Sequence, residues 1–534
     1  GRDGRIITTP PNGLDSTSGV AAYEQIAGLF INQAQTKVVE MLRESGAMLG
    51  EPRSIMHPVK FFEKGDRPLE IVTSRQWYIR NGGRDTDLRG ALLNRGENLV
   101  WHPDHMRHRY SNWVEGLNGD WLISRQRYFG VPVPVWYPVD AEGETVHDSP
   151  IVPTEDMLPI DPSTDVPPEY TADQRNQPHG FIGDPDVMDT WATSSLSPQI
   201  AGKWEDDADL FGRIFPMDLR PQAHDIIRTW LFSTVVRSNF EHDSLPWKNA
   251  ALSGWILDPD RKKMSKSKGN VVTPVDLFEK FGSDAVRYWA ASARPGIDTA
   301  FSEDQMKVGK KLATKLLNAT KFVLTFPQPD VDAKPTHPVD LAMLARVAET
   351  VREATVAFDQ YDYARALERT EAMFWWFCDD YVELVKGRVY NSQGLDASGS
   401  AISALRLALS ALQRLLAPFM PFTTETVWRW WQDGSVHTAT WPTAAELGPI
   451  GDSAILDPIG EILSQVRRAK TDAKTSQKTI VTEATVSAPE AVLAAFELGR
   501  GDLSDAGSVR SWVTKPSAGE TTVSAVLAPP EPAS

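Results

Sequence analysis

The residues best suited to chemistry lie in a basic loop that reads DPDRKKMSKSKGNVVTP, from Asp258 to Pro274. Ammonium groups in such a loop can close over a polyphosphate and stabilise the charge that develops as a phosphate bond breaks. A lysine- and serine-rich stretch is more often a solvated turn, so the order of its residues must decide between the two interpretations. Gly269 leaves the loop flexible, and six polar side chains precede it: Lys262, Lys263, Ser265, Lys266, Ser267 and Lys268.

A second segment, RPQAHDIIRTW from Arg220 to Trp230, has the residue types of an amino-acid pocket. On a helix, Ile226 and Trp230 are four residues apart and share one face, with Asp225 beside them. The segment then offers a carboxylate to a cation and a small apolar surface to a side chain. The alternative is an ordinary buried helix start in which Asp225 is the capping residue.

A third segment, DPDVMDTWATSSLSP, places Trp191 directly after an Asp-Thr pair, and by itself it also fits a core tryptophan beside a turn. Together the three segments resemble the valyl-tRNA synthetases, class I aminoacyl-tRNA synthetases, of the type without a long C-terminal coiled coil. Lys-Met-Ser-Lys-Ser is the lysine signature of that class, and Asp-Thr-Trp separates valyl from isoleucyl enzymes. Further similarity lies in Ser253–Trp255, Gly269–Val272, the connecting-region stretch Asp120–Tyr137 with Pro132, and the anticodon-domain stretch Leu416–Trp428.

The resemblance implies a reaction and a set of site residues. The reaction is the ATP-dependent ligation of L-valine to tRNA(Val) through a valyl-adenylate, with ATP and Mg²⁺ as substrate. Asp225 would hold the α-ammonium of valine, and three apolar side chains would surround its methyl groups. The implied catalytic residues are Lys263, Ser265, Lys266 and Ser267, and both lysines would also bind ATP. Further contacts to ATP would come from Gly254, Trp255 and His224. The walls of the amino-acid pocket would be Ile226, Trp230 and Trp191.

The sequence also departs from the family pattern. Relatives begin their nucleotide-binding fold with a His-Ile-Gly-His type signature, which does not occur here. We therefore expect the chain to begin inside the inserted editing domain, to lack half of the Rossmann-type sheet, and to have neither editing nor complete adenylation activity alone. A missing N-terminal portion of the same enzyme is then an expected partner. Leu122 and Pro138 replace cysteines of relatives, and Cys378 is the single cysteine, so no protein-bound zinc or other metal is expected.

The helices and strands that are expected to position these residues indicate a multidomain protein, in which an α/β part is followed by an all-α part. The length of 534 residues fits several domains. Helical periodicity predicts a helix before Gly46, another from Pro274 to Ser292, a helical region from 340 to 432, and a basic amphipathic helix from Ile459 to Lys474. We expect an editing-domain remnant (1–58), a connecting region with an acidic arm (59–183), the C-terminal half of a Rossmann-type catalytic domain (184–300), a helical stem-contact and anticodon-binding domain (301–450), and a small appended domain (451–534).

The net charge of −16 does not exclude an RNA partner, because the acidity is local. Thirteen acidic residues and only one basic residue, Arg175, lie between Asp140 and Asp189, which leaves −4 for the rest of the chain. This proline-rich stretch lacks periodicity and is interpreted as a long solvated connection. No apolar run is long enough for a membrane span, and the cysteine content fits a reducing cytoplasm.

Two basic stretches are candidates for tRNA contact. Lys307, Lys311 and Lys315 repeat every fourth residue, and Arg467 and Arg468 begin the second stretch. Charged helix faces are more often simply solvated, and the resemblance is what favours RNA. Two other hypotheses stay open: an isoleucyl or leucyl enzyme of the same class, and a non-catalytic tRNA-binding protein.

Overall fold

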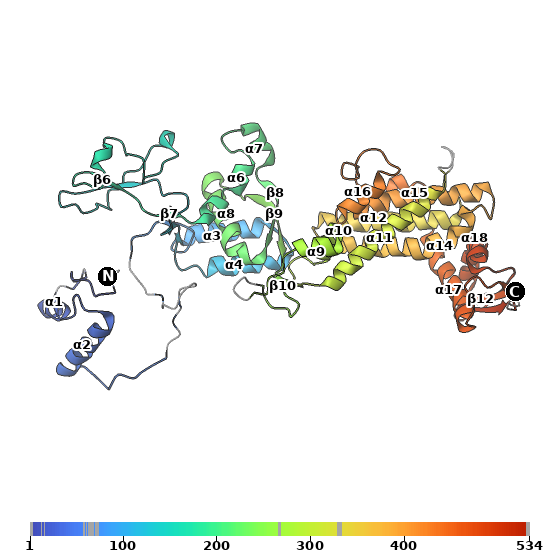
Figure 1. Cartoon of the computed structure of the whole chain (residues 1–534), viewed down its shortest axis with the longest axis horizontal. Coiled ribbons are helices and arrows are strands. Elements are labelled where there is room, and N and C mark those ends of the chain that lie inside the picture. Colours follow the sequence, from blue (N-terminus) through green and yellow to red (C-terminus); the bar gives the residue numbers. More distant parts are fainter. Residues whose placement is uncertain are drawn as a thin grey trace. The chain divides into compact units, whose positions relative to one another are not determined.

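The computed structural model describes residues 4–11, 13–14, 16–56, 59, 61, 69, 74–264, 269–327 and 334–529 (Figure 1). Contacts divide the chain into two compact units, one of residues 1–80 and 120–190 and the other of residues 81–119 and 191–534. Of the loop residues singled out above, Ser265, Lys266, Ser267 and Lys268 lie outside the described part. No helix among the described residues is long and apolar enough to cross a membrane.

The first unit contains short strands that pair in antiparallel twos, β1 with β3, β4 with β7 and β5 with β6. The predicted helix before Gly46 is confirmed as α2. The elements are α1 (Thr17–Glu24), α2 (Ile31–Glu44), β1 (Tyr78–Ile79), β3 (Trp121–Leu122), β4 (Ser124–Arg125), β5 (Trp136–Pro138), the 3₁₀ turns η2 (Glu155–Met157) and η3 (Ala172–Gln174), β6 (Phe181–Gly183) and β7 (Val187–Met188).

The acidic, proline-rich stretch is a folded part of this unit, so its interpretation as a solvated connection is wrong. Strand β6 closes it by pairing with β5, and Trp136 and Phe181 are fully buried. Its one basic residue, Arg175, donates to the carbonyl oxygens of Pro162 at 2.7 Å and Asp165 at 2.5 Å. Periodicity could not reveal this structure, because turns and prolines rather than regular elements build it.

The second unit begins with a parallel sheet in the order β2-β9-β8. The helix α3 packs on α4 and on α8. The elements of this part are α3 (Thr86–Asn98), β2 (Val100–His102), η1 (Asp104–Met106), α4 (Arg107–Glu115), α5 (Thr190–Ser194), α6 (Ser197–Ala201), α7 (Ala208–Ile214), β8 (Met217–Ala223), the 3₁₀ turn η4 (His224–Ile226), the π-helical turn η5 (Ile227–Leu231), α8 (Phe232–His242), β9 (Trp247–Ser253), β10 (Ile256–Leu257) and β11 (Thr299–Ala300).

The segment after the lysine loop forms two helices where one was predicted. Helix α9 (Val275–Phe281) ends at Gly282, and α10 (Ser283–Ala291) begins directly after it. Gly282 has a φ of 88°, a conformation that glycine adopts at little cost and that a helix cannot contain. The break therefore has a local cause, which the apolar periodicity alone did not show.

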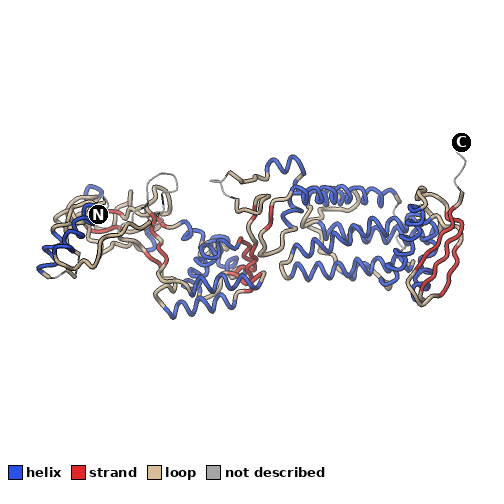
Figure 2. Tube along the Cα trace, turned by 90° about the horizontal axis from the view of Figure 1, so that it is seen from below, coloured by secondary structure: helices blue, strands red, loops and turns tan. Residues whose placement is uncertain are grey.

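A bundle of long helices follows, as the sequence predicted for residues 340 to 432 (Figure 2). Of its four consecutive aromatic residues, Phe374 and Phe377 are fully buried, while Trp375 and Trp376 are half-buried. The bundle consists of α11 (Glu303–Thr325), α12 (Pro338–Asp359), α13 (Tyr363–Trp376), the π-helical turn η7 (Phe377–Tyr381), α14 (Val382–Val389), α15 (Leu395–Leu416) and α16 (Pro421–Trp428), followed by the 3₁₀ turns η8 (Ala444–Leu447) and η9 (Ser453–Ile455).

A small α/β subdomain completes the unit. It contains α17 (Leu456–Asp472), which confirms the predicted amphipathic helix, then β12 (Val481–Ala488), α18 (Glu490–Gly507), β13 (Trp512–Pro516) and β14 (Thr522–Leu527). The strands lie in the order β13-β12-β14. A buried ion cluster ties the subdomain to the bundle: Arg388 of α14 donates to Asp340 of α12 and to Asp502 of α18.

Candidate functional site

The candidate site lies at the carboxyl ends of two neighbouring parallel strands in the second unit. Ala223, the last residue of β8, is paired in register with Ser253, the last residue of β9. His224 and Gly254 follow these residues, so the two segments that the sequence singled out start from the same edge of the sheet. Ligands of open α/β sheets bind at this edge, where the strands end.

Asp298 joins these two segments. Its Oδ1 atom accepts a hydrogen bond from the backbone N–H of Trp255 at 2.8 Å and lies 3.3 Å from Nε2 of His224. The rings of His224 and Trp255 meet edge to face, with their centroids 4.8 Å apart. Gly254 leaves no room for a side chain, because a Cβ atom there would lie 2.3 Å from the backbone of Ile297.

Two polar atoms in this group are buried without a hydrogen-bond partner among the described residues: Nδ1 of His224 and Nε1 of Trp255. Buried polar atoms in folded proteins are normally paired. If Asp298 accepts the Nε2–H of His224, the Nδ1 atom is left as a hydrogen-bond acceptor. The group is thus equipped to receive a polar ligand.

The base of the lysine loop is firmly held beside this group. The carboxylate of Asp258 accepts hydrogen bonds from the backbone N–H of Lys262 at 2.7 Å and from the side chain of Asn270 at 2.8 Å. These bonds hold the pKa of Asp258 below its usual value. The Lys263 ammonium lies 4.1 Å from the centroid of the Trp255 ring. Lys263 is therefore brought to the site, whereas Ser265, Lys266 and Ser267 lie outside the described residues.

The two tryptophans of the predicted pocket are connected through α5. The indole N–H of Trp230 lies 2.7 Å from the carbonyl oxygen of Ser194 and 3.2 Å from the hydroxyl of Ser197. Ser194 is three residues after Trp191, and both belong to α5. Trp191, Trp230 and Ile226 are all half-buried, so each has part of its surface open.

The local geometry around Asp225 differs from the prediction. Ile226 ends a 3₁₀ turn and Trp230 lies in a π-helical turn, so the two are not stacked on an α-helical face as expected. Asp225 is exposed and does not cap the helix, because the N-cap position is Ala223. In the described part of the chain, no hydrogen bond or ion pair occupies its carboxylate. Single π-helical turns are rare and frequently occur at functional sites.

The predicted tRNA contacts differ in their availability. Lys307, Lys311 and Lys315 all lie on α11, but Lys307 pairs with Asp304 at 2.8 Å and Lys315 with Asp379 at 2.6 Å, while Lys311 is exposed. On α17, Arg468 is exposed and Arg467 is half-buried.

Within the same basic stretch, the side chain of Lys470 is buried and donates to the carbonyl oxygens of Gln477 at 2.8 Å and Gly507 at 2.7 Å. The ammonium group of Lys470 is therefore hydrogen-bonded within the subdomain.

In the part of the chain that the structure describes, neither a metal site nor a reactive thiol lies near the sheet edge. Among the described residues, no group of three or more His, Cys, Asp and Glu side chains could hold a metal ion. Cys378 is buried in the bundle, and burial raises the pKa of its thiol to about 12. A protonated, buried thiol is a poor nucleophile and metal ligand.

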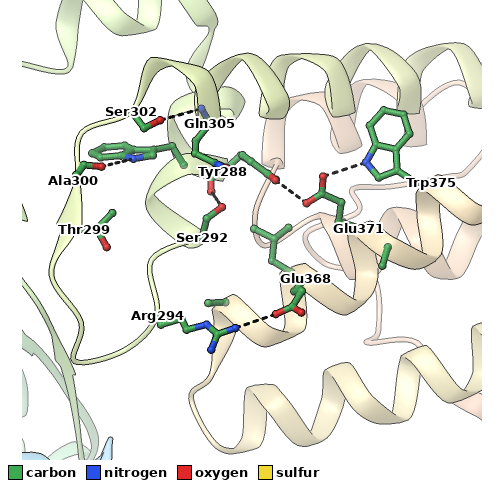
Figure 3. A pocket seen from close by; sticks show the side chains of 14 residues that line it. Tyr288, Ser292, Arg294, Thr299, Ala300, Ser302, Gln305, Glu368, Glu371 and Trp375 are labelled. Carbon is green, nitrogen blue, oxygen red and sulfur yellow. Dashed lines mark hydrogen bonds and ion pairs between the residues drawn. The ribbon is translucent and has the colours of Figure 1, made fainter. Parts of the chain in front are cut away.

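A cavity of about 530 Å³ lies between the α10–α11 segment and α13 (Figure 3). Figure 3 shows that several of its polar side chains are paired: Glu371 accepts from Tyr288 at 2.7 Å and from Trp375 at 3.1 Å, and Arg294 lies 3.5 Å from Glu368. None of the predicted site residues lines it. The Tyr288–Glu371 and Arg294–Glu368 pairs connect α10 and the segment after it to α13 of the bundle.

Sequence reasoning missed two polar residues of the site. Asp298 lies in the stretch RPGIDTAF, which carries no motif of its own, and only the fold brings it to His224. Arg220 opens the second segment and was given no role, yet its guanidinium carbon lies 3.1 Å from the centroid of the Trp230 ring. The sequence carries no signal for this contact, because the burial pattern of β8 is known only from the fold.

Two family descriptions match the chain. Residues 23–302 match "tRNA synthetases class I (I, L, M and V)", and residues 340–485 match "Anticodon-binding domain of tRNA ligase". A solved structure titled as the ternary complex of Agrobacterium radiobacter K84 agnB2 LeuRS-tRNA-LeuAMS has a TM-score of 0.50 and 16% identity, over 74% of this chain and 51% of that one. At this identity the likeness concerns the fold alone.

Among curated proteins, the chain is similar to proteins named valine--tRNA ligase. It is 62% identical over 519 residues to one from Thermobifida fusca (strain YX) and 56% identical over 531 residues to one from Salinispora tropica. Each match covers 96% of this chain but only 59% and 62% of the respective relative. The chain thus spans about three fifths of the length of these relatives.

Proposed function

The chain belongs to the class I aminoacyl-tRNA synthetases, and we propose that it takes part in the ATP-dependent ligation of L-valine to tRNA(Val). The proposal rests mainly on three features of the two segments that leave this sheet edge: the exposed carboxylate of Asp225, the hydrogen bond from Trp230 to α5, and the Lys263–Trp255 contact. Similarity to valine--tRNA ligases over 96% of the chain supports valine as the amino acid.

In the proposed reaction, one carboxylate oxygen of valine attacks the α-phosphorus of ATP, and pyrophosphate leaves with the β- and γ-phosphates. Asp225 binds the α-ammonium of valine, and Trp191, Trp230 and Ile226 surround its methyl groups. Charge grows on the leaving pyrophosphate, and lysines next to it stabilise that charge more in the transition state than in the ground state. We assign this role to Lys263 and Lys266, with Ser265 and Ser267 in the same loop.

The nucleotide is proposed to lie against His224, Gly254 and Trp255. Support comes from the unpartnered Nδ1 of His224 and from Gly254, whose lack of a side chain lets the Ile297 backbone approach and bring Asp298 to His224 and Trp255. ATP enters with Mg²⁺ as part of the substrate. In the second step, a ribose hydroxyl at the 3′ end of tRNA attacks the carbonyl carbon of the valyl-adenylate, and AMP leaves.

The tRNA partner is proposed to contact the basic residues of two helices, Lys307, Lys311 and Lys315 on α11 and Arg467 and Arg468 on α17. Phosphate contacts dominate such affinity and make it depend on salt. Lys311 and Arg468 are exposed, so they are expected to contribute most. The five-part division of the chain stated above is retained as part of this proposal.

The test is valine-dependent exchange of pyrophosphate into ATP. It is measured with the chain alone and with the chain mixed with the N-terminal two fifths of the Thermobifida fusca relative. Exchange with valine in either arm supports the proposal. Exchange with isoleucine or leucine instead indicates a neighbouring specificity, and binding of tRNA without exchange in either arm indicates a non-catalytic RNA-binding role.

A further inference from the structure

Arg220 is an unusual buried arginine. It lies on β8 and is 7% exposed, and its guanidinium carbon is 3.1 Å from the centroid of the Trp230 ring and 5.3 Å from that of Trp247. Its Nε atom donates to Gln222 at 3.1 Å. One terminal nitrogen is buried without a hydrogen-bond partner in the described part of the chain, and no ion pair there involves Arg220.

A buried arginine normally pairs with a carboxylate, because an uncompensated buried charge is costly. Here the face of the Trp230 indole ring takes the place of the carboxylate. A planar guanidinium can lie flat on such a ring, which a lysine ammonium cannot imitate. Burial lowers the pKa of Arg220 to about 10, so the group is still charged at neutral pH.

The same ring is held at its edge by α5. Its N–H donates to the carbonyl oxygen of Ser194 at 2.7 Å, and the hydroxyl of Ser197 is 3.2 Å away. One hydrogen bond leaves a ring free to tilt about the bond, whereas a second restraint on its face removes that freedom. Arg220 therefore fixes how Trp230 faces the helix that carries Trp191.

We propose that Arg220 determines amino-acid specificity, by holding the Trp230 wall so that the pocket accepts valine and excludes a side chain one methylene longer. The proposal rests on the proposed function, and it makes Arg220 a positioning residue because it acts through Trp230. A pocket excludes a larger side chain only if its walls cannot yield. Discrimination by one methylene is at best about 200-fold, so a small movement of one wall is measurable.

The experiment compares equilibrium binding of two stable adenylate analogues, the sulfamoyl adenosines of valine and of isoleucine, to the full chain. The variants are Arg220→Lys, which keeps the charge without the planar stack, and Arg220→Met, which removes the charge and keeps a long side chain. The control is Arg95→Met, since Arg95 packs on α8 through a 2.9 Å hydrogen bond to Asn239, away from the pocket. Circular dichroism establishes that each variant is folded.

We expect the preference for the valine analogue to fall about tenfold in both Arg220 variants and to be unchanged in Arg95→Met. A merely structural role would weaken binding of both analogues alike and leave their ratio intact. Loss of preference in Arg220→Met alone still supports the proposal and assigns the effect to charge. An unchanged ratio in both folded variants overturns this inference alone. If the wild-type chain binds neither analogue, with or without the N-terminal two fifths of the Thermobifida fusca relative, the proposed function is overturned as well.

Discussion

Replacing Arg388 by methionine is predicted to loosen the C-terminal subdomain from the helix bundle. Arg388 is fully buried and donates to Asp340 at 2.6 and 2.7 Å and to Asp502 at 2.6 Å. Methionine has a similar linear stem, so the change removes the charge and its hydrogen bonds while it largely preserves the packing. Two buried carboxylates then face each other without a cation.

The magnitude follows from this geometry. Removing one partner of a buried ion pair costs about 3–5 kcal/mol, since the other charge stays buried. Asp340 keeps hydrogen bonds from Tyr381 at 2.7 Å and Ser400 at 2.6 Å, whereas Asp502 keeps, among the described residues, only a 3.4 Å contact from Gln393. The loss therefore falls mainly on α18. At about 1.4 kcal/mol per factor of ten, local opening of α18 should become roughly 10²- to 10³-fold more frequent.

Hydrogen–deuterium exchange measures this opening directly. Amides of α18 and α14 should exchange roughly 10²- to 10³-fold faster in Arg388→Met, while those of α11 provide an internal reference. Adding Asp340→Asn and Asp502→Asn removes the uncompensated charges and should restore most of the protection. Wild-type protection of α18 in the single variant would refute the reasoning.

Three further predictions concern the site and the subdomain. Asp298→Ala should raise the KM for ATP in the pyrophosphate-exchange assay at least tenfold, with a smaller effect on the KM for valine. The reason is that the Trp255 N–H loses a charge-assisted hydrogen bond worth about 1.5–3 kcal/mol. Equal changes in both constants would argue against this role. Gly254→Ala should abolish pyrophosphate exchange in a folded chain, because the added Cβ would lie 2.3 Å from the Ile297 backbone. Wild-type activity of this variant would show that the segments around Gly254 and Ile297 can separate freely. Burial raises the pKa of Asp502 from 3.8 to about 6, so the folded state favours its protonated form. The stability of α18 should therefore be greatest below pH 4 and decline as pH rises through 6. Hydrogen–deuterium exchange protection of α18, measured from pH 4 to 7, should show this slope in the wild type and lose it in Asp502→Asn.

Candidate site residues can be predicted from the sequence where they form contiguous motifs. The lysine loop and the segment that contains Asp225 and Trp230 are such motifs, and the chain segments that lead into them leave the sheet at one edge, after Ser253 and Ala223. Asp298 and Arg220 could not be assigned in this way, because their partners are distant in the chain or lie on another element. A single polar residue gives no periodic signal, so only tertiary structure reveals its role.

Helical periodicity predicted the long elements well and their interruptions poorly. The bundle and α17 follow from apolar spacing. The break at Gly282 and the π-helical turn before α8 do not, since each depends on the backbone of one or a few residues. Lys470 shows the same limit for charge: it lies in a basic stretch, yet its ammonium is buried against two carbonyl oxygens.

The most direct test of the proposed site is the binding of the valine sulfamoyl adenosine to the wild-type chain, to Asp225→Asn and to Asp218→Asn. Asp218 is an exposed carboxylate on β8, the strand that precedes Asp225, and it already pairs with Lys248 at 2.9 Å, so it serves as the matched control. The wild type and Asp218→Asn should bind the analogue alike, and Asp225→Asn should bind at least tenfold more weakly, because it loses the carboxylate for the α-ammonium. Equal binding by all three proteins, or no binding by the wild type even with the N-terminal two fifths of the Thermobifida fusca relative added, would contradict the assignment of this sheet edge as the valine-activating site.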